Sequence, residues 1–466
     1  MARNKPKTIG ELRSSGYEVV SVREELRRNL IKKIRQGEEL FPGIVGYDES
    51  VIPQLENALL SGQDIIFLGE RGQAKSRLIR SLGSLLDDEV PAIAGCEIND
   101  NPYDPICKRC REWLAKDGDK VEIEWLGRDS RYGEKLATPD ITIADLIGEV
   151  DPIKVAEGRY LSDELTIHYG LVPRTNRGIF CINELPDLAE RIQVGLLNIM
   201  EERDVQIRGY RIRLPLDVYV VASANPEDYT NRGRIITPLK DRYGAQIRTH
   251  YPRNVEHEIG IMEQEMYQFH DVDYKVTVPQ YMKEIVVEIT RLARRSPDVN
   301  QRSGVSVRAS IADYESLLAN ALRRAIRLNE TDIVPRISDL PYVIPTISGK
   351  VEFETVEDGR EEQILEKLIQ GAVVAVFNRY FNVIELEEVV GQFKGGLEVE
   401  VSDTLASAAY VKAAKRIDGL EQALAKIAPE REPPLVASAL EFVLEGLHLN
   451  KRLNKDKVAG RVQYRG

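Results

Sequence analysis

The sequence lacks any apolar run near the roughly 20 residues that a membrane-spanning helix needs. Its first ten residues, MARNKPKTIG, carry no apolar stretch behind the basic side chains. We therefore expect neither a membrane span nor a secretory signal. Four cysteines in 466 residues are too few for a disulfide scaffold and are typical of the reducing cytoplasm. Internal repeats and low-complexity tracts are lacking as well.

An excess of positive charge is also missing. The formal net charge is −11 at pH 7, whereas nucleic-acid binding normally needs a basic surface, so we do not expect a nucleic-acid partner. A hydrophobic content of 42% and a charged content of 30% are ordinary for globular proteins. The length allows about three domains. Composition thus predicts a cytoplasmic multidomain protein and leaves its chemistry open.

Several short apolar runs between residues 41 and 255 read as strands that end in polar residues. Continuous apolar runs with helical patterns between them favour a parallel sheet covered by helices, an α/β domain. Ligands on such sheets bind beyond the carboxyl ends of the strands, so the polar tips should converge on one site. The runs are DIIFLG (64–69), GIFCINE (178–184), VYVVASANPED (218–228) and AQIRTHYP (245–252), with VPAIAG (90–95) as the candidate fifth strand.

The rest of the sequence is mainly helical in pattern. Residues 1–40 contain the amphipathic segment SVREELRRNLIKKIRQG, whose glycine predicts the end of a helix. Residues 256–345 predict an α-helical domain, and a linker marked by two prolines precedes 346–466. That last part predicts a mainly helical extension without a motif that indicates its role. The expected organisation therefore has four parts, with the α/β domain at 41–255.

The segment GERGQAKS (69–76) follows the first apolar run and precedes a helical pattern. A glycine-rich turn there presents backbone N–H groups to phosphate oxygens, while Lys75 reaches the outer phosphates and Ser76 binds Mg²⁺. The pattern GxxxxGK[ST] is met except that Ala74 replaces its second glycine, which requires a compatible φ there. ATP and Mg²⁺ are the predicted cofactors. The predicted nucleotide contacts are Gly69, Glu70, Arg71, Gly72, Gln73, Ala74, Lys75, Ser76 and Arg77.

Two later strand ends carry the residues expected to act on ATP. GIFCINE ends in Asn183 and Glu184, where an acidic pair is typical. Glu184 is the predicted base that polarises the attacking water. Asn183 can hydrogen-bond a magnesium-bound water but brings no charge, so we expect weaker metal binding or slower turnover. Asn225, at the end of VYVVASAN, would lie beside Glu184 and position the water with its amide.

These three elements, in this order, resemble the AAA+ ATPases, most closely the magnesium-chelatase ATPase subunit and the related MoxR group. The resemblance covers about residues 41–345. It implies a five-stranded parallel sheet with flanking helices, a helical lid and a homo-oligomeric ring, with a hexamer as the family precedent. Residues 145–178 are similar to the insertion that this branch carries before its second motif, and 202–221 are similar to its β-hairpin.

The resemblance also implies an arginine that acts on the neighbouring subunit's nucleotide. PLKDRYGAQI is similar to the LxDRF phrase and gives Arg242, whose guanidinium would neutralise charge at the γ-phosphate. Arg232 and Arg234, in TNRGRII, are alternatives. A surface salt bridge is the other interpretation of Arg242.

Three further residues come from the resemblance alone. GVSVRAS (304–310) is similar to the second sensor at the start of a lid helix and gives Arg308, although arginines on helices often only face solvent. IVGYDE (44–49) would line the adenine pocket, with Val45 and Gly46 as its contacts.

The four cysteines could bind a metal or remain free thiols. Cys96, Cys107 and Cys110 have the spacing C-x10-C-x2-C, and the CxxC pair suits a zinc knuckle. A fourth ligand is missing and no histidine lies nearby in the sequence, so free thiols are the favoured interpretation. Cys181 is expected to be a buried strand residue.

The leading hypothesis is an ATP-hydrolysing ring motor that remodels a partner or helps to insert metal into it. In the resembled families this partner often carries a von Willebrand A domain. A nucleotide-gated scaffold with little hydrolysis is a second hypothesis, which Ala74 and Asn183 support. A transcriptional regulator with an enhancer-binding ATPase is the third; it is disfavoured because neither a GAFTGA loop nor a helix-turn-helix pattern is visible.

Overall fold

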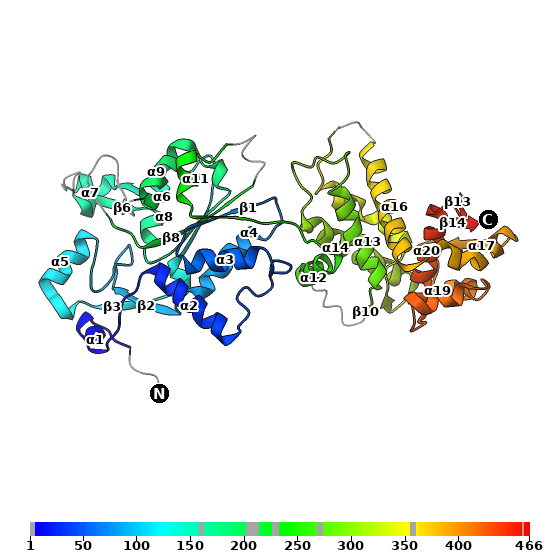
Figure 1. Cartoon of the computed structure of the whole chain (residues 1–466), viewed down its shortest axis with the longest axis horizontal. Helices are drawn as coiled ribbons and strands as arrows, with labels where there is room; N and C mark the ends of the chain where they lie inside the picture. Colours follow the sequence, from blue (N-terminus) through cyan, green and yellow to red (C-terminus); the bar gives the residue numbers. More distant parts are fainter. Residues whose placement is uncertain are drawn as a thin grey trace. The chain divides into compact units, whose positions relative to one another are not determined.

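The structure is a computed structural model, and the chain divides into two compact units, Met1–His250 and Tyr251–Gly466 (Figure 1). The finer boundaries expected near residues 40, 255 and 345 stay predictions. The structure describes residues 5–157, 163–201, 214–225, 233–267, 274–354, 360–458 and 461–466.

A five-stranded sheet forms the centre of the first unit. All its strands run parallel, in the order β4-β7-β8-β1-β9. This confirms the predicted fold class and four of the predicted strands. The strands are β1 (Ile65–Leu68), β4 (Tyr132–Leu136), β7 (Gly178–Asn183), β8 (Val218–Ala224) and β9 (Ala245–Arg248).

Helices cover both faces of this sheet (Figure 1). Side chains alternate along β7, so Ile179 and Cys181 join one core while Phe180 and Ile182 join the other. The first core is completed by α2 (Val22–Gln36), α3 (Val51–Leu60) and α4 (Lys75–Ser81). The second is completed by α6 (Ile143–Leu146), α8 (Leu171–Arg174), α9 (Glu190–Glu201) and α11 (Thr237–Arg242).

The predicted N-terminal helix is confirmed as α2. The hydroxyl of Ser21 accepts a hydrogen bond from the backbone N–H of Glu24 and caps its start. Gly37 ends it in the left-handed conformation, at φ 67°.

The prediction of residues 90–95 as the fifth strand of the sheet is wrong. They fall in β2 (Glu89–Ile93), which pairs antiparallel with β3 (Ile123–Gly127) in a separate two-stranded sheet. The fifth strand is β4, with the sequence YGEKL. It lies at the edge of the sheet and is only partly buried, so it has no continuous apolar run to reveal it.

The insertion expected at 145–178 contains a small antiparallel sheet. It pairs β5 (Gly148–Val150) with β6 (Ile167–Tyr169), and α7 (Pro152–Ala156) lies between them in the chain. Residues 202–213 of the hairpin expected at 202–221 lie outside the described part of the chain.

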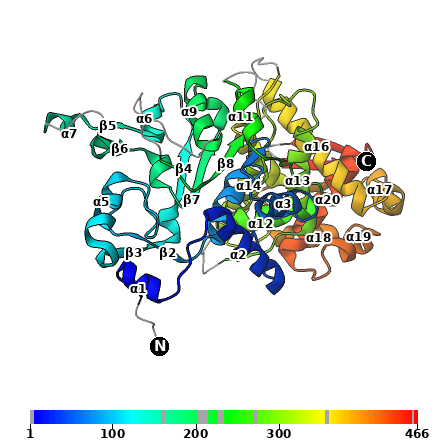
Figure 2. The same cartoon turned by 60° about the vertical axis from the view of Figure 1, so that its left-hand side comes forward.

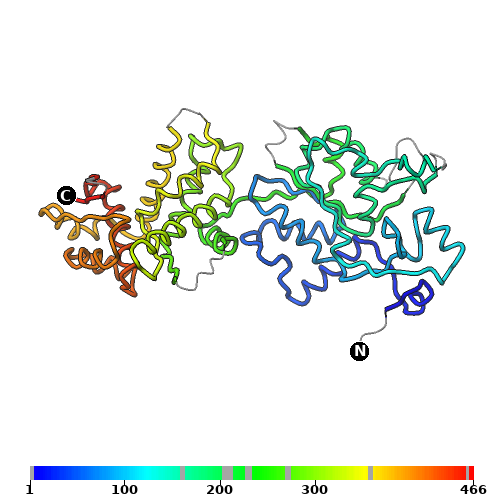
Figure 3. The backbone as a smooth tube through the Cα atoms, turned by 180° about the vertical axis from the view of Figure 1, so that it is seen from behind, coloured from blue at the N-terminus to red at the C-terminus, as the bar shows by residue number. Residues whose placement is uncertain are grey.

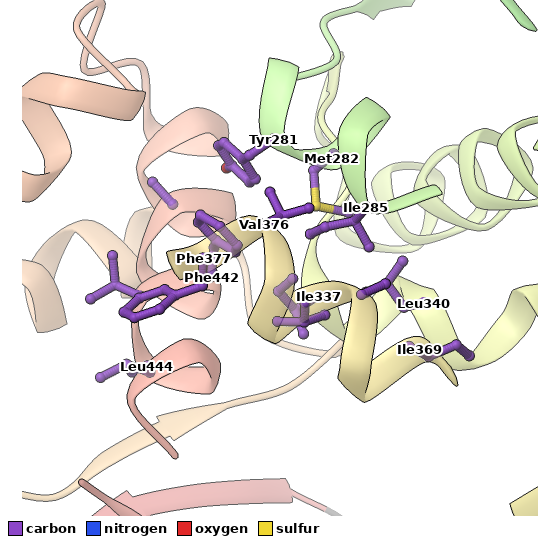
Figure 4. Packing of buried hydrophobic residues seen from close by; sticks show 14 of the residues in the cluster. Tyr281, Met282, Ile285, Ile337, Leu340, Ile369, Val376, Phe377, Phe442 and Leu444 are labelled. Atoms are coloured by element: carbon purple, nitrogen blue, oxygen red, sulfur yellow. The ribbon is translucent and has the colours of Figure 1, made fainter. Parts of the chain in front are cut away.

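One hydrophobic core runs through the second unit, and residues on both sides of position 345 contribute to it. Its aromatic centre stacks Tyr281 on Phe442 at 4.4 Å between ring centroids, with Phe377 beside them (Figure 4). Among the described residues, no helix has the length and apolarity to cross a bilayer.

The helices of this unit account for the predicted helical lid and extension. They are α12 (Val255–Glu265), α13 (Gln280–Ala293), α14 (Val307–Leu328), α15 (Ile344–Ser348), α16 (Arg360–Tyr380), α17 (Glu387–Lys394), α18 (Ser407–Ala414), α19 (Leu420–Ile427) and α20 (Pro433–Leu449). The short strands are β10 (Lys275–Val276), β11 (Asp332–Ile333), β12 (Val399–Val401), β13 (Asn454–Val458) and β14 (Arg461–Arg465).

Candidate nucleotide-binding site

The loop between β1 and α4 carries the predicted phosphate cradle. Lys75 begins α4, and its side chain is buried among the carbonyl groups of the loop. Its ammonium donates to the backbone oxygen of Gly69 and, at 2.8 Å, to that of Glu70. The charge of Lys75 therefore lies inside the loop, where a phosphate would meet it, while Ser76 and Arg77 are exposed beside it.

Ala74 has the backbone conformation that its position demands. Its φ is 55° and its ψ is 16°, in the left-handed region, which a residue with a Cβ adopts less readily than glycine. The sequence predicted this requirement from the missing glycine. The cradle thus keeps its shape at a cost in local backbone strain.

Ala74→Gly should therefore stabilise the first unit by roughly 0.5–1 kcal/mol. Glycine removes the free-energy cost of the left-handed conformation, and its greater conformational entropy in the unfolded chain offsets part of that gain. Urea unfolding followed by tryptophan fluorescence measures this, because both tryptophans, Trp113 and Trp125, lie in that unit. Ala58→Gly, inside α3, is the matched control and should destabilise it. A loss of stability in Ala74→Gly would contradict the inference that the backbone at Ala74 is strained.

Gly69 is required because other side chains pack against its backbone. A Cβ there would overlap the hydroxyl of Thr249 and the amide oxygen of Gln73. That amide oxygen accepts hydrogen bonds from Thr249 Oγ1 at 2.7 Å and from the Glu70 N–H at 3.1 Å. The buried Gln73 side chain therefore braces the loop.

Tyr47 also supports the loop, and the sequence reasoning missed it. It follows Val45 and Gly46, which are half-buried before α3. Its buried hydroxyl donates to the backbone oxygens of Gln73 at 2.9 Å and His250 at 2.8 Å. Burial raises the pKa of Tyr47 to about 12, so it stays a donor. The predicted adenine segment is thus tied to the phosphate loop.

The ends of the neighbouring strands meet this loop at the same edge of the sheet. The Gly69 N–H donates to the Ala224 oxygen at 3.1 Å, which places Asn225 directly beside the loop. The Glu184 N–H donates to Ser223 Oγ at 3.2 Å. Glu184 adopts φ 54°, and Asn225 is 1% exposed. The structure therefore brings together the loop, Glu184 and Asn225, as their order on parallel strands predicted.

Asn183 lies between two side chains from the flanking strands. Its amide nitrogen donates to Glu134 Oε1 at 2.6 Å, and its amide oxygen accepts from Ser223 Oγ at 3.1 Å. Arg80 holds Glu134 through two bonds of 2.9 Å and lowers the pKa of that carboxyl. Position 183 lacks the usual acid, but Glu134 of β4 places a carboxylate next to it. Glu134 could not be predicted from the sequence because β4 has no continuous apolar run.

Three arginines, Arg242, Arg232 and Arg234, are proposed to act across a subunit boundary, and Arg308 as the second sensor. Arg242 ends α11, where Nη2 contacts Glu201 Oε1 at 2.6 Å, and its side chain is 33% exposed. Arg234 is exposed, and Arg232 lies outside the described residues. Arg308 is exposed in the first turn of α14, in the second unit. The roles of these arginines stay predictions.

The residues present fit ATP with Mg²⁺. Positive φ at Ala74 turns the loop so that successive N–H groups can face one anion, and Lys75 supplies positive charge. The oxygens of Ser76, Asn183 and Glu134 are the hard donors that Mg²⁺ prefers. The charged donor among them comes from Glu134.

Comparisons with known proteins agree with this geometry. The magnesium-chelatase 38 kDa subunit of Cereibacter sphaeroides is 29% identical over 227 residues, which cover 48% of this chain and 62% of that protein. Magnesium-chelatase subunit ChlI of Synechocystis is 26% identical over 364 residues, covering 72% and 94% respectively. The ChlI subunit of Nostoc is 24% identical over 77% of this chain and 94% of its own length. No protein-family model matches.

Solved structures give weaker matches. A cryo-EM-based complex between subunits BchI and BchD of magnesium chelatase matches with 21% identity and a TM-score of 0.36, covering 70% of this chain and 98% of that one. NtrX from Brucella abortus in complex with ATP matches with 14% identity and a TM-score of 0.41, covering 79% and 69%. Both TM-scores are below 0.5, so the relationship stands on the sequence matches. With its parallel sheet and phosphate loop, the chain is thus similar to the magnesium-chelatase ChlI subunits, which are AAA+ ATPases.

Proposed function

We propose that this protein binds and hydrolyses ATP as a ring-forming motor that remodels a partner protein. The observation that carries the proposal is the meeting of the Lys75 loop with Glu184 and Asn225 at one edge of the sheet. Those groups supply, in order, charge for the phosphates, a base and an amide that can orient water.

Each residue has a separate task in this proposal. The loop N–H groups and Lys75 orient the triphosphate, and Glu184 accepts the proton of the attacking water. The amide of Asn225 holds that water in line. Ser76, Asn183 and Glu134 would hold Mg²⁺, with Asn183 acting through a water bound to the ion. Mg²⁺ supplies charge neutralisation on the phosphate oxygens when bound.

The assembly and partner are proposals of the same kind. Arg242 would complete the site of the neighbouring subunit, with the hexamer as the family precedent. The matched relatives are subunits of magnesium chelatase, and one matched structure is a BchI–BchD complex. By analogy we propose a partner with a von Willebrand A domain, metal insertion as one form of the remodelling and a cytoplasmic location.

A nucleotide-gated scaffold is the second candidate. Two observations favour it: Ala74 strains the cradle, and the uncharged Asn183 stands where an acid is typical. A scaffold would bind ATP and change its assembly, yet turn over few molecules. The ATPase rate separates the two candidates.

A mixing experiment tests the ring motor. Arg242→Ala and Lys75→Ala should each lose ATPase activity by at least about 10³-fold, since one removes the charge supplied in trans and the other the phosphate contact. Equal mixing should restore activity, because about one quarter of randomly formed interfaces join an intact Lys75 to an intact Arg242.

Lys240→Ala, an exposed position on the same helix as Arg242, is the control and should retain activity. A mixture that stays inactive, although size-exclusion chromatography shows mixed rings, would sink the action of Arg242 in trans. ATP-dependent assembly without measurable turnover in the unmodified protein would favour the scaffold.

A further inference from the structure

Four side chains of the first unit converge at one point outside the nucleotide site. They come from the segment that connects β2 to β3, residues 94–122, which we call the excursion. Its path can be followed in cyan in Figure 3. One ligand atom from each of Cys96, Asp100, Cys107 and Cys110 lies within 4.8 Å of all the others. Three of the four side chains are fully buried; Cys96 is partly exposed. The sequence spacing had shown the cysteines but not the carboxylate.

The local backbone holds these groups in place. Cys107 caps the start of α5 (Lys108–Asp117), and its sulfur accepts the N–H of Cys110 at 3.3 Å. The sulfur of Cys96 accepts the N–H of Asp100 at 3.4 Å. Such N–H donors, with the positive end of a helix beside two sulfurs, stabilise thiolates. The chain thus orients three sulfurs toward a common centre.

Asp100 is the buried carboxylate of the cluster. Its side chain is 0% exposed, and its two oxygens accept the N–H groups of Ile106 and Cys107 at 3.1 Å each. In the described part of the chain, no lysine, arginine or histidine forms an ion pair with it. A buried carboxylate without a cation is costly, and a metal ion would supply the missing positive charge.

We propose that Cys96, Asp100, Cys107 and Cys110 bind one structural zinc ion. Zinc in structural sites takes four ligands from Cys, His and Asp in a tetrahedron, and bonds of about 2.3 Å place the sulfurs about 3.8 Å apart. The four atoms lie within 4.8 Å of one another, so side-chain rotations could bring them to that separation. Three thiolates favour zinc over Mg²⁺ or Ca²⁺, which prefer oxygen. With all four positions filled by protein, the ion has no site for a substrate.

The ion would close the excursion on itself, and the closed excursion contacts the insertion that precedes β7 through hydrogen bonds. Lys108, which follows the ligand Cys107, donates its N–H to Glu164 Oε1 at 2.6 Å and its ammonium to Asp163 Oδ1 at 2.8 Å. Asn176 Nδ2 donates to the Ile98 oxygen at 3.0 Å. Figure 2 shows α5 and the β2–β3 pair below the β5–β6 sheet. Zinc would thus brace the region that leads into Asn183 and Glu184.

Metal analysis of the purified full-length protein tests the proposal. Mass spectrometry of metals should find about one zinc per chain. Cys107→Ser and Cys110→Ser should each retain less than about a tenth of that zinc, and Asp100→Asn, which removes one of the four ligands, should weaken zinc binding by at least about tenfold. Cys181→Ala is the matched control, a buried cysteine outside the cluster, and should keep its zinc.

The unmodified protein also tests the site if a variant fails to fold. A mercurial that modifies thiols should release one zinc per chain, and cobalt exchanged into the site should show the charge-transfer band of thiolate ligands and the visible bands of a tetrahedral ion. Protein that holds no zinc after growth and refolding with excess zinc would overturn the proposal. A disulfide within the cluster of the purified protein would overturn it too. Neither result bears on ATP hydrolysis, which is measured separately.

Discussion

Glu184→Gln should lower the steady-state ATPase rate about 10²–10⁴-fold, the range expected when a general base is removed. Glutamine keeps the size of Glu184 and its backbone hydrogen bond to Ser223, so the loop around Lys75 should be unaffected. ATP binding should therefore stay within a few-fold of the unmodified protein. A coupled assay for ADP gives the rate, and calorimetry or a fluorescent ATP analogue gives the affinity. Activity that survives the substitution would remove Glu184 from the role of base.

Two further variants make this result specific. Glu190→Gln, on the exposed start of α9, removes the same charge a short distance along the chain and should leave the rate unchanged. Glu134→Gln removes the carboxylate that contacts Asn183, so it should raise the Mg²⁺ concentration needed for half-maximal rate. Excess Mg²⁺ should rescue Glu134→Gln but not Glu184→Gln. Rescue of both would assign Glu184 to metal binding instead.

Local chemistry explains what the sequence predicted well. The phosphate loop is a contiguous segment between a strand and a helix, and Ser21 and Gly37 bound α2 by their own conformational preferences. The strain at Ala74 followed from one position of one motif. Glu184 and Asn225 could be placed together because parallel strands present their carboxyl ends at one edge.

Contacts between distant segments explain the features that could not be predicted from the sequence. β4 is an edge strand with Glu134 and Lys135 in its middle. It is a strand because it pairs with β7, and no apolar run in its sequence indicates it. Glu134 reached the site only through that pairing. Asp100 joins Cys107 because the loop folds back on itself, and no spacing rule for zinc ligands includes it. VPAIAG has the composition of a buried strand, yet its partner is β3.

Arg131→Met should destabilise the first unit by about 3–5 kcal/mol, because it leaves one charge of a buried pair without its partner. Arg131 precedes β4, and its guanidinium meets Glu25 of α2 through bonds of 2.8 and 2.5 Å. The two side chains are 2% and 3% exposed. The pair joins the N-terminal helix to the edge strand that carries Glu134. Urea unfolding followed by the fluorescence of Trp113 and Trp125 measures the loss.

The double variant Glu25→Met with Arg131→Met separates loss of the pair from loss of packing. Without either charge the site becomes apolar, so the double variant should be less destabilised than the sum of the two single variants. Arg28→Met on the same helix breaks an ion pair with Asp87 in which the arginine is 49% exposed, and it should cost less than about 1 kcal/mol. Additive losses in the double variant would mean that the pair contributes nothing beyond the separate contacts of its members. In that case the burial of Val22, Leu26 and Leu30 would contribute more than this pair to holding α2 on the sheet.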